Sequence, residues 1–174
     1  MIVFLTGACG VGKTTLLNNL RQMLPPEGHE FFHSDRSPVP TEEEMRKLHD
    51  GWEEWQAAHT EKWIERLLAR PQGKHLFYDG QFNLDFVVDG MTKRGRTDYR
   101  IVLIHCPVDE MNRRLIEERN QPELAHHHQA NWNRFLHRQA TEKGVLMLDS
   151  TLLPPEEFAR HFMVSVFGEE AGGF

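Results

Sequence analysis

Residues 7–14 read Gly-Ala-Cys-Gly-Val-Gly-Lys-Thr and match the pattern G-x-x-x-x-G-K-[ST] of a phosphate-binding loop, the Walker A motif. Four apolar residues, Ile2–Leu5, stand directly before this loop and predict a buried strand. After the loop, apolar residues recur at helical spacing, at Leu16, Leu17, Leu20, Met23 and Leu24. A strand, a glycine-rich loop and a helix in this order are what the motif requires, so we expect residues 1–24 to bind a nucleoside triphosphate.

Each residue type in the loop has a physical role. The glycines allow backbone N–H groups to close around phosphate oxygens, and the start of the helix adds its unpaired N–H groups and positive dipole end. Lys13 supplies a positive charge for the β- and γ-phosphates, and the Thr14 hydroxyl can ligate Mg²⁺. The predicted nucleotide-binding residues are Gly7, Ala8, Cys9, Gly10, Val11, Gly12, Lys13, Thr14 and Thr15.

Length and charge restrict the class of protein further. The chain has 174 residues and a formal net charge of −6. We expect one domain, and the negative charge disfavours nucleic acid as a partner without excluding it. The chain contains no apolar run of the roughly 18 residues that a membrane span needs, so no membrane partner is expected. The two cysteines, Cys9 and Cys106, are far apart in sequence, which fits a cytoplasmic protein without structural disulfides.

Apolar runs alternate with helical patterns along the whole chain. We expect buried strands at Ile2–Leu5, Glu30–His33, His75–Tyr78, Ile101–Cys106 and Val145–Leu148. This alternation predicts an α/β fold, in which helices cover both faces of a parallel sheet. A long helical stretch is expected over residues 41–70, opened by a capping box at Thr41 and Glu44. A second helix is expected from Pro122 to Gly144.

Carboxylates follow two of the predicted strands. Asp35 comes just after the second strand and could accept the proton of an attacking hydroxyl or hold Mg²⁺ in place of Asp79, or could only cap a turn. Asp79 ends the third strand and could hold Mg²⁺ opposite Thr14, or could only form an Asp-Gly turn. Gln81 follows closely and is a candidate hydrogen-bonding partner of a substrate.

Three arginines, Arg113, Arg114 and Arg119, lie on the helix predicted after the fourth strand and at its end. Arginines that close over a γ-phosphate stabilise the charge of a phosphoryl-transfer transition state, so all three are catalytic candidates. The alternative is a solvated helix face on which arginines pair with Glu117 and Glu118.

Aromatic residues on the stretch 41–70 allow two interpretations. Trp52, Trp55 and Trp63 could pack into the core, which is their commoner use, or could form a wall for a ring-bearing substrate. Consecutive histidines at 126–128 point about 100° apart on a helix and so cannot easily share one metal ion.

Taken together, the phosphate loop, Asp35, the turn Cys106–Glu110 before the arginine helix, and Leu148-Asp149-Ser150 resemble the small P-loop kinases. These are the nucleoside-monophosphate-kinase-like enzymes, such as shikimate kinase, gluconate kinase, chloramphenicol phosphotransferase and the polynucleotide 5′-kinases. The resemblance implies a three-layer sandwich around a five-stranded parallel sheet with strand order 2-3-1-4-5, and a lid.

The resemblance also implies roles for particular segments. Residues 41–70 correspond to the acceptor-binding helical region and residues 119–131 to the lid, where the histidines replace the usual arginines. Arg113, Arg114 and Arg119 match the lid-side arginines of these kinases, and Asp35 stands where the shikimate and polynucleotide kinases place their base. Arg36 stands where an arginine grips the acceptor, and Asp149 and Ser150 lie where these enzymes wrap the adenine.

The expected function is therefore transfer of the γ-phosphoryl group of Mg²⁺-ATP to a hydroxyl of a small-molecule acceptor. ATP is favoured over GTP because the chain lacks the N-K-x-D sequence that recognises guanine. Two alternatives stay open from sequence. One is a polynucleotide 5′-hydroxyl kinase, and the other is a regulatory nucleotide-binding ATPase module without an acceptor.

Overall fold

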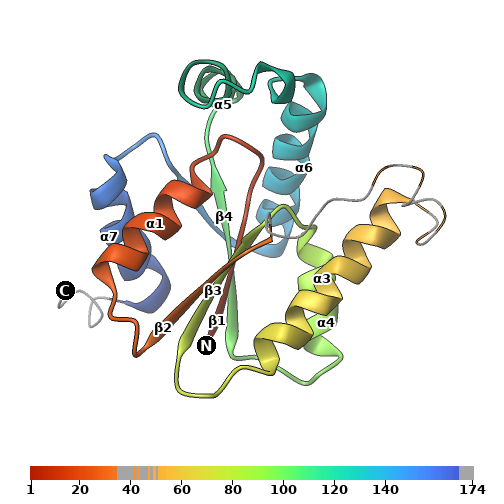
Figure 1. The fold of residues 1–174 in the computed structure, drawn as a ribbon, viewed down its shortest axis with the longest axis vertical. Coiled ribbons are helices and arrows are strands. Elements are labelled where there is room, and N and C mark those ends of the chain that lie inside the picture. Colours follow the sequence, from red (N-terminus) through yellow and green to blue (C-terminus); the bar gives the residue numbers. More distant parts are fainter. Residues whose placement is uncertain (35–40, 42, 44–46, 48, 50, 169–174) are drawn as a thin grey trace.

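Five parallel strands form one sheet at the centre of the protein, in the order β2-β3-β1-β4-β5 (Figure 1). The computed structural model describes residues 1–34, 41, 43, 47, 49 and 51–168. The predicted strand order is confirmed, and each predicted strand is found within three residues of its expected bounds. The strands are β1 (Ile2–Thr6), β2 (His29–His33), β3 (His75–Gly80), β4 (Tyr99–His105) and β5 (Leu146–Asp149).

Helices cover both faces of the sheet, as expected for a parallel sheet. One face carries α1 (Lys13–Met23) and α7 (Pro155–Phe167), and the other carries α3 (Trp52–Leu68), α4 (Leu84–Thr92) and α6 (His127–Lys143). Past β4 lies α5 (Val108–Arg113), which continues as a π-helix over Arg114–Glu118 and stands at the top of Figure 1. A 3₁₀ turn spans Pro122–Leu124. Among the described residues no helix combines the length and the apolar character that crossing a membrane requires.

The central strand β1 shows why the sequence folds in this way. All five of its residues are buried, and they alternate between two cores. Val3 and Leu5 pack with α1 and α7, whereas Ile2 and Phe4 pack with α3, α4 and α6. A strand that is apolar on both sides must be covered on both sides, which places β1 in the middle of the sheet.

The register brings the carboxyl ends of three strands together. Thr6 at the end of β1 pairs with Gly80 of β3 and with Leu103 of β4. The loops after β1, β3 and β4 therefore leave the sheet at the same edge, where ligands bind in open parallel sheets.

Two helical predictions need correction or lie partly outside the described residues. The single helix expected from Pro122 to Gly144 is wrong, because Ala125 (ψ 62°) and His126 (ψ 169°) leave helical geometry and separate the 3₁₀ turn from α6. In the stretch 41–70 the structure has α3 after Gly51. Glu44 of the expected capping box lies outside the described residues.

Candidate active site

The glycine-rich loop between β1 and α1 packs directly against the segment that follows β4. Gly7 has φ 153°, and a Cβ there would stand 2.3 Å from the Ile104 carbonyl oxygen. Gly10 has φ 81°, and a Cβ there would stand 2.9 Å from Leu115 Cγ and 3.0 Å from the Met111 carbonyl oxygen. Side chains are excluded at both positions, so only glycine lets the loop backbone lie this close to its neighbours.

The start of α1 offers positive electrostatic potential beside this loop. Its N-cap, Gly12, makes no side-chain cap, and its first turn holds no acidic residue. The Lys13 ammonium donates hydrogen bonds to the carbonyl oxygens of Gly7 at 2.8 Å and Ala8 at 2.9 Å. A helix start, a glycine loop and a lysine charge therefore converge at one point, an arrangement suited to an anion.

A cavity of about 1060 Å³ opens over this point and is walled by the segments after β1, β4 and β5. Its volume is large enough for a nucleotide, given that ligand pockets run to roughly 1,000 Å³. Of the residues predicted to bind nucleotide or to act in transfer, those lining it are Cys9, Gly10, Gly12, Lys13, Thr14, Thr15, Gln81, Arg113, Arg114, Arg119 and Ser150.

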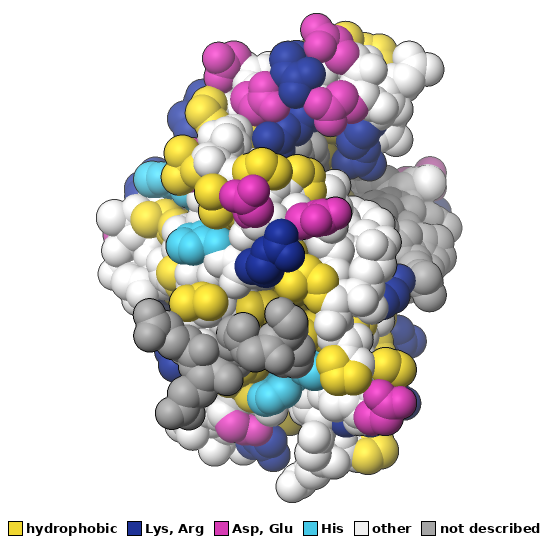
Figure 2. All heavy atoms as spheres, turned by 90° about the vertical axis from the view of Figure 1, so that its left-hand side faces the viewer, with side chains coloured by type: hydrophobic (Ala, Val, Ile, Leu, Met, Phe, Trp, Pro, Cys, Tyr) yellow, Lys and Arg dark blue, Asp and Glu magenta, His cyan; other side chains and the backbone are white. Residues whose placement is uncertain are grey.

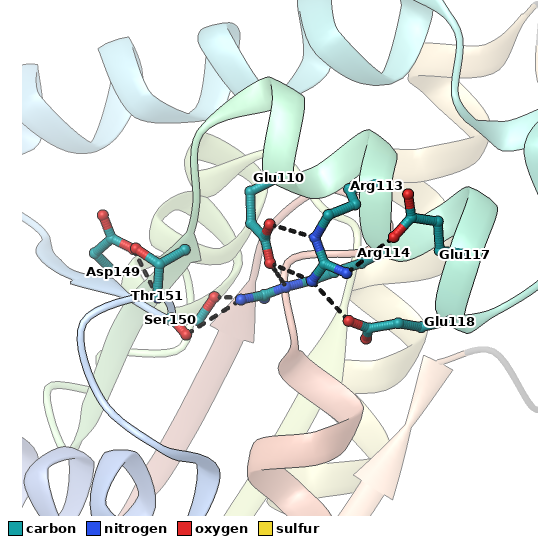
Figure 3. Close-up of polar contacts among 8 residues, drawn as sticks. All are labelled: Glu110, Arg113, Arg114, Glu117, Glu118, Asp149, Ser150 and Thr151. Atoms are coloured by element: carbon teal, nitrogen blue, oxygen red, sulfur yellow. Dashed lines mark hydrogen bonds and ion pairs between the residues drawn. The ribbon is translucent and has the colours of Figure 1, made fainter.

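Arg114 joins two walls of the cavity (Figure 3). Its Nε donates to Glu110 Oε1 at 2.7 Å, and its Nη1 donates to Ser150 Oγ at 2.9 Å. Its side chain is only 18% exposed. Arg114 thus fixes the segment after β5 against α5, close to Gly12 of the phosphate loop.

Arg113 is engaged by three carboxylates. It pairs with Glu110 at 2.8 Å, with Glu117 at 3.3 Å and with Glu118 at 2.7 Å. Hydrogen bonds from Arg113 and Arg114 lower the pKa of Glu110 to about 2, and those carboxylates raise the pKa of Arg113. Figure 2 shows the resulting mixture of acidic and basic side chains at the top of the molecule.

Arg119 differs from both. It is exposed and lines the cavity. Within the part of the chain that the structure describes, its side chain makes no hydrogen bond or ion pair. Its charge is therefore the one among the three arginines that is not already neutralised by a carboxylate.

The segment after β5 supplies a polar turn and an apolar wall. Asp149 Oδ1 accepts hydrogen bonds from the backbone N–H of Thr151 at 2.8 Å and from its hydroxyl at 2.6 Å. Ser150 and Thr151 line the cavity, whereas Asp149 holds the turn behind them. Leu153 and Phe158 extend the same wall with apolar surface. Such a wall suits the flat face of a nucleobase.

Asp79 is 2% exposed at the end of β3, and its Oδ1 lies 3.4 Å from His33 Nδ1. Thr14 is exposed and lines the cavity. Among the described residues no cluster of three or more His, Cys, Asp and Glu side chains could hold a metal ion. Mg²⁺ in nucleotide sites needs only one or two protein oxygens, because phosphates and water complete its shell. Of the two predicted Mg²⁺ ligands, Thr14 lines the cavity, whereas Asp79 is buried at the end of β3 and is not among the lining residues.

Cys9 of the phosphate loop forms hydrogen bonds with two glutamines. Gln81 Nε2 donates to Cys9 Sγ at 3.1 Å, and the Cys9 backbone N–H donates to Gln129 Oε1 at 3.1 Å. Gln129 lies on α6, 120 positions away along the chain. Its proximity to the loop results from tertiary packing and leaves no local signal in the sequence.

Two predicted residues, Asp35 and Arg36, lie outside the described residues. Glu110 and Phe158 also line the cavity, although they were not predicted as site residues. Glu110 accepts hydrogen bonds from Arg113 and Arg114, and Phe158 adds apolar surface. Glu110 stands three and four residues before Arg113 and Arg114, a spacing that signals helical pairing and could have identified it.

No family model matches the chain, and no curated protein matches it in sequence. Solved structures do match. The chain has the fold of the small P-loop kinases.

It is similar to the tunicamycin resistance protein of Deinococcus radiodurans, with a TM-score of 0.60 and 19% identity over 95% of each chain. It is also similar to shikimate kinase from Acinetobacter baumannii in complex with shikimate, with a TM-score of 0.55 and 17% identity over 95% of this chain and 92% of that one. APS kinase from Mycobacterium tuberculosis in complex with AMPPNP and APS gives a TM-score of 0.55 and 16% identity, over 93% of this chain and 94% of that one.

Proposed function

We propose that the protein is a kinase that transfers the γ-phosphoryl group of Mg²⁺-ATP to a hydroxyl of a small-molecule acceptor. The observation that carries this proposal is one cavity lined by the glycine loop, by Lys13 at the start of α1 and by Arg119 after the π-helix. Two solved structures of the same fold are small-molecule kinases, one in complex with shikimate and one with AMPPNP and APS.

The nucleotide would occupy the cavity in a defined direction. The loop amides and Lys13 hold the β- and γ-phosphates, and the adenine lies toward Ser150 and the turn held by Asp149, against Phe158. Thr14 and Asp79 would hold Mg²⁺, which when bound neutralises phosphate charge.

Transfer requires a base and a cation near the γ-phosphate. We assign Asp35 as the base that receives the proton of the acceptor hydroxyl, while Arg36 and Gln81 donate hydrogen bonds to the acceptor. Arg119 stabilises the transition-state charge, because Arg113 is engaged by three glutamates and Arg114 by Glu110 and Ser150. The chain would act as one domain, with residues 41–70 next to the acceptor and residues 119–131 as the lid.

The test is transfer of γ-phosphate label from ATP with Mg²⁺ to pooled small hydroxyl compounds and, in parallel, to a 5′-hydroxyl oligonucleotide. Lys13→Ala should abolish transfer while the fold survives. Asp35→Asn should lower it by about two to four powers of ten with ATP binding little changed. Arg119→Ala should lower it by about three powers of ten, the lower end for a catalytic arginine. Arg138→Ala removes an exposed arginine on α6 and serves as the matched control.

The outcomes separate the candidate functions. Label on the oligonucleotide would show a polynucleotide kinase instead. If the wild type binds ATP, Lys13→Ala does not, and no acceptor becomes labelled, the regulatory nucleotide-binding module would be favoured. Transfer that survives Lys13→Ala would contradict the proposed role of the phosphate loop.

A further inference from the structure

A second cavity, of about 430 Å³, adjoins the first and is walled largely by aromatic side chains. Trp52 and Trp55 come from α3, and Trp132 comes from α6. Tyr78 and Phe82, stacked at 5.7 Å and 13°, come from the end of β3 and the segment after it. The cavity therefore lies between the two helices that flank this edge of the sheet.

The tryptophans of α3 do not all serve the core. Trp63 is 8% exposed and packs with the buried residues of β1 and β3. Trp52 is 54% exposed, and its ring lies 5.1 Å from that of Trp55 at a tilt of 42°. Trp55 stacks in turn on the His59 ring at 5.1 Å and 23°. These three rings on successive turns of α3 all line the second cavity. Aromatic surface of this kind stacks readily on the flat face of another ring.

The described lining of the second cavity contains no Lys, Arg, Asp or Glu side chain. His59 adds no charge, because its Nε2 accepts a hydrogen bond from Trp63 Nε1 at 3.3 Å and burial, with Arg66 and Lys62 nearby, lowers its pKa. In this tautomer His59 Nδ1 carries the proton and can donate to a ligand. Recognition by the described lining therefore rests on its aromatic rings and neutral hydrogen-bonding groups, together with the exposed imidazole of His128.

The second cavity reaches the phosphate loop at Cys9. Gln81 lines both cavities and donates to Cys9 Sγ, and Gln129 lines the second cavity while it accepts from the Cys9 N–H. A ligand in the second cavity can therefore present a hydroxyl toward the end of a bound triphosphate. Transfer needs the reacting atoms to approach to about 3–3.5 Å.

We propose that the second cavity binds the acceptor, and that the acceptor is an alcohol with a flat aromatic ring that stacks on Trp52, Trp55 and Trp132. This inference rests on the proposed kinase function. The acceptor oxygen forms a bond to the γ-phosphorus as the bond from that phosphorus to the bridging oxygen of ADP breaks. The proton of the hydroxyl passes to the base assigned above, and the products are ADP and a phosphate monoester.

The test uses three pools of hydroxyl compounds with γ-labelled ATP. The first holds uncharged aromatic alcohols, namely nucleosides, aryl glucosides and benzylic alcohols. The second holds matched anions, namely nucleoside 3′-monophosphates, aryl glucuronides and hydroxymethylbenzoates. The third holds uncharged compounds without an aromatic ring, namely alkyl glucosides and polyols. ATP binding is measured separately by equilibrium dialysis, so that loss of nucleotide binding is recognised on its own.

We expect label in the first or second pool, whose compounds carry an aromatic ring, and none in the third. For the labelled compound, Trp55→Ala should raise KM about 10-fold or more, Trp55→Phe should restore most of that loss, and ATP affinity should not change. Val164→Ala, which removes an exposed apolar side chain of α7 that lines neither described cavity, is the control.

Label confined to the third pool, or no label in any pool while ATP binds, would overturn the inference. A KM unaffected by Trp55→Ala would also overturn it. Failure to bind ATP would instead refute the proposed function on which it rests.

Discussion

Gly10 is the most sharply testable position in the phosphate loop. Its φ of 81° lies in the left-handed region, which costs a residue with a side chain about 1–2 kcal/mol. In Gly10→Ala the new Cβ would also stand 2.9 Å from Leu115 Cγ and 3.0 Å from the Met111 carbonyl oxygen. Both neighbours belong to the buried segment after β4, and overpacking such a site costs about 1–3 kcal/mol more. We therefore expect Gly10→Ala to lower the free energy of unfolding by about 2–5 kcal/mol.

The chain contains a matched control for the backbone part of this cost. Gly95 has φ 62°, and a Cβ there would meet nothing within 4 Å. Gly95→Ala should therefore cost only the backbone contribution of about 1–2 kcal/mol. Equilibrium urea unfolding, followed by tryptophan fluorescence, measures both variants. If Gly10→Ala destabilises the protein no more than Gly95→Ala, the close packing of the loop on Leu115 and Met111 is refuted.

Two further predictions concern titrating groups near the candidate site. Glu110 has its folded pKa lowered from 4.5 to about 2, so its contribution to stability is complete above about pH 4.5 and is lost as pH falls through 2. The urea midpoint should thus fall more steeply from pH 5 to pH 2 in the wild type than in Glu110→Gln, and parallel curves would contradict the pairing. Burial raises the pKa of Cys106 to about 11, so a thiol reagent at pH 8 should modify only the half-buried Cys9 quickly. ATP should slow that reaction, and rapid loss of two thiols in the folded protein would contradict the expected burial of Cys106.

The fold could be predicted from the sequence because its signals are local. Each strand contains a short apolar run, and the first four residues of β1 are all apolar, which predicts burial on both faces. The expected sheet order rested on the resemblance to P-loop kinases, because apolar runs alone do not say which strands are neighbours. The break between Pro122–Leu124 and α6 was missed because Ala125 and His126 are not strong helix breakers. Their backbone geometry is determined by tertiary packing.

The candidate site was predictable only where one short segment forms it. The loop residues and Lys13 share a contiguous motif, so their proximity follows from the sequence alone. Gln129 and Phe158 reach the same region from helices far along the chain, and no spacing connects them to the loop. The tryptophans illustrate the same limit. Their helical spacing allowed either core or ligand contact, and only the position of α3 relative to α6 places Trp63 in the core and Trp52 at the second cavity.

The three arginines show how a shared sequence feature divides into separate environments. Arg113 pairs with glutamates three, four and five residues away. This pairing is what the interpretation as a solvated helix face predicts. Arg114, one residue on, turns toward Ser150 because the helix rotates about 100° per residue. Arg119 follows the end of the π-helix, where no carboxylate of α5 reaches it within the described residues. A guanidinium that already pairs with carboxylates has less net charge to offer a transferred phosphate, so among these three side chains we favour Arg119, which has no such pair within the described residues.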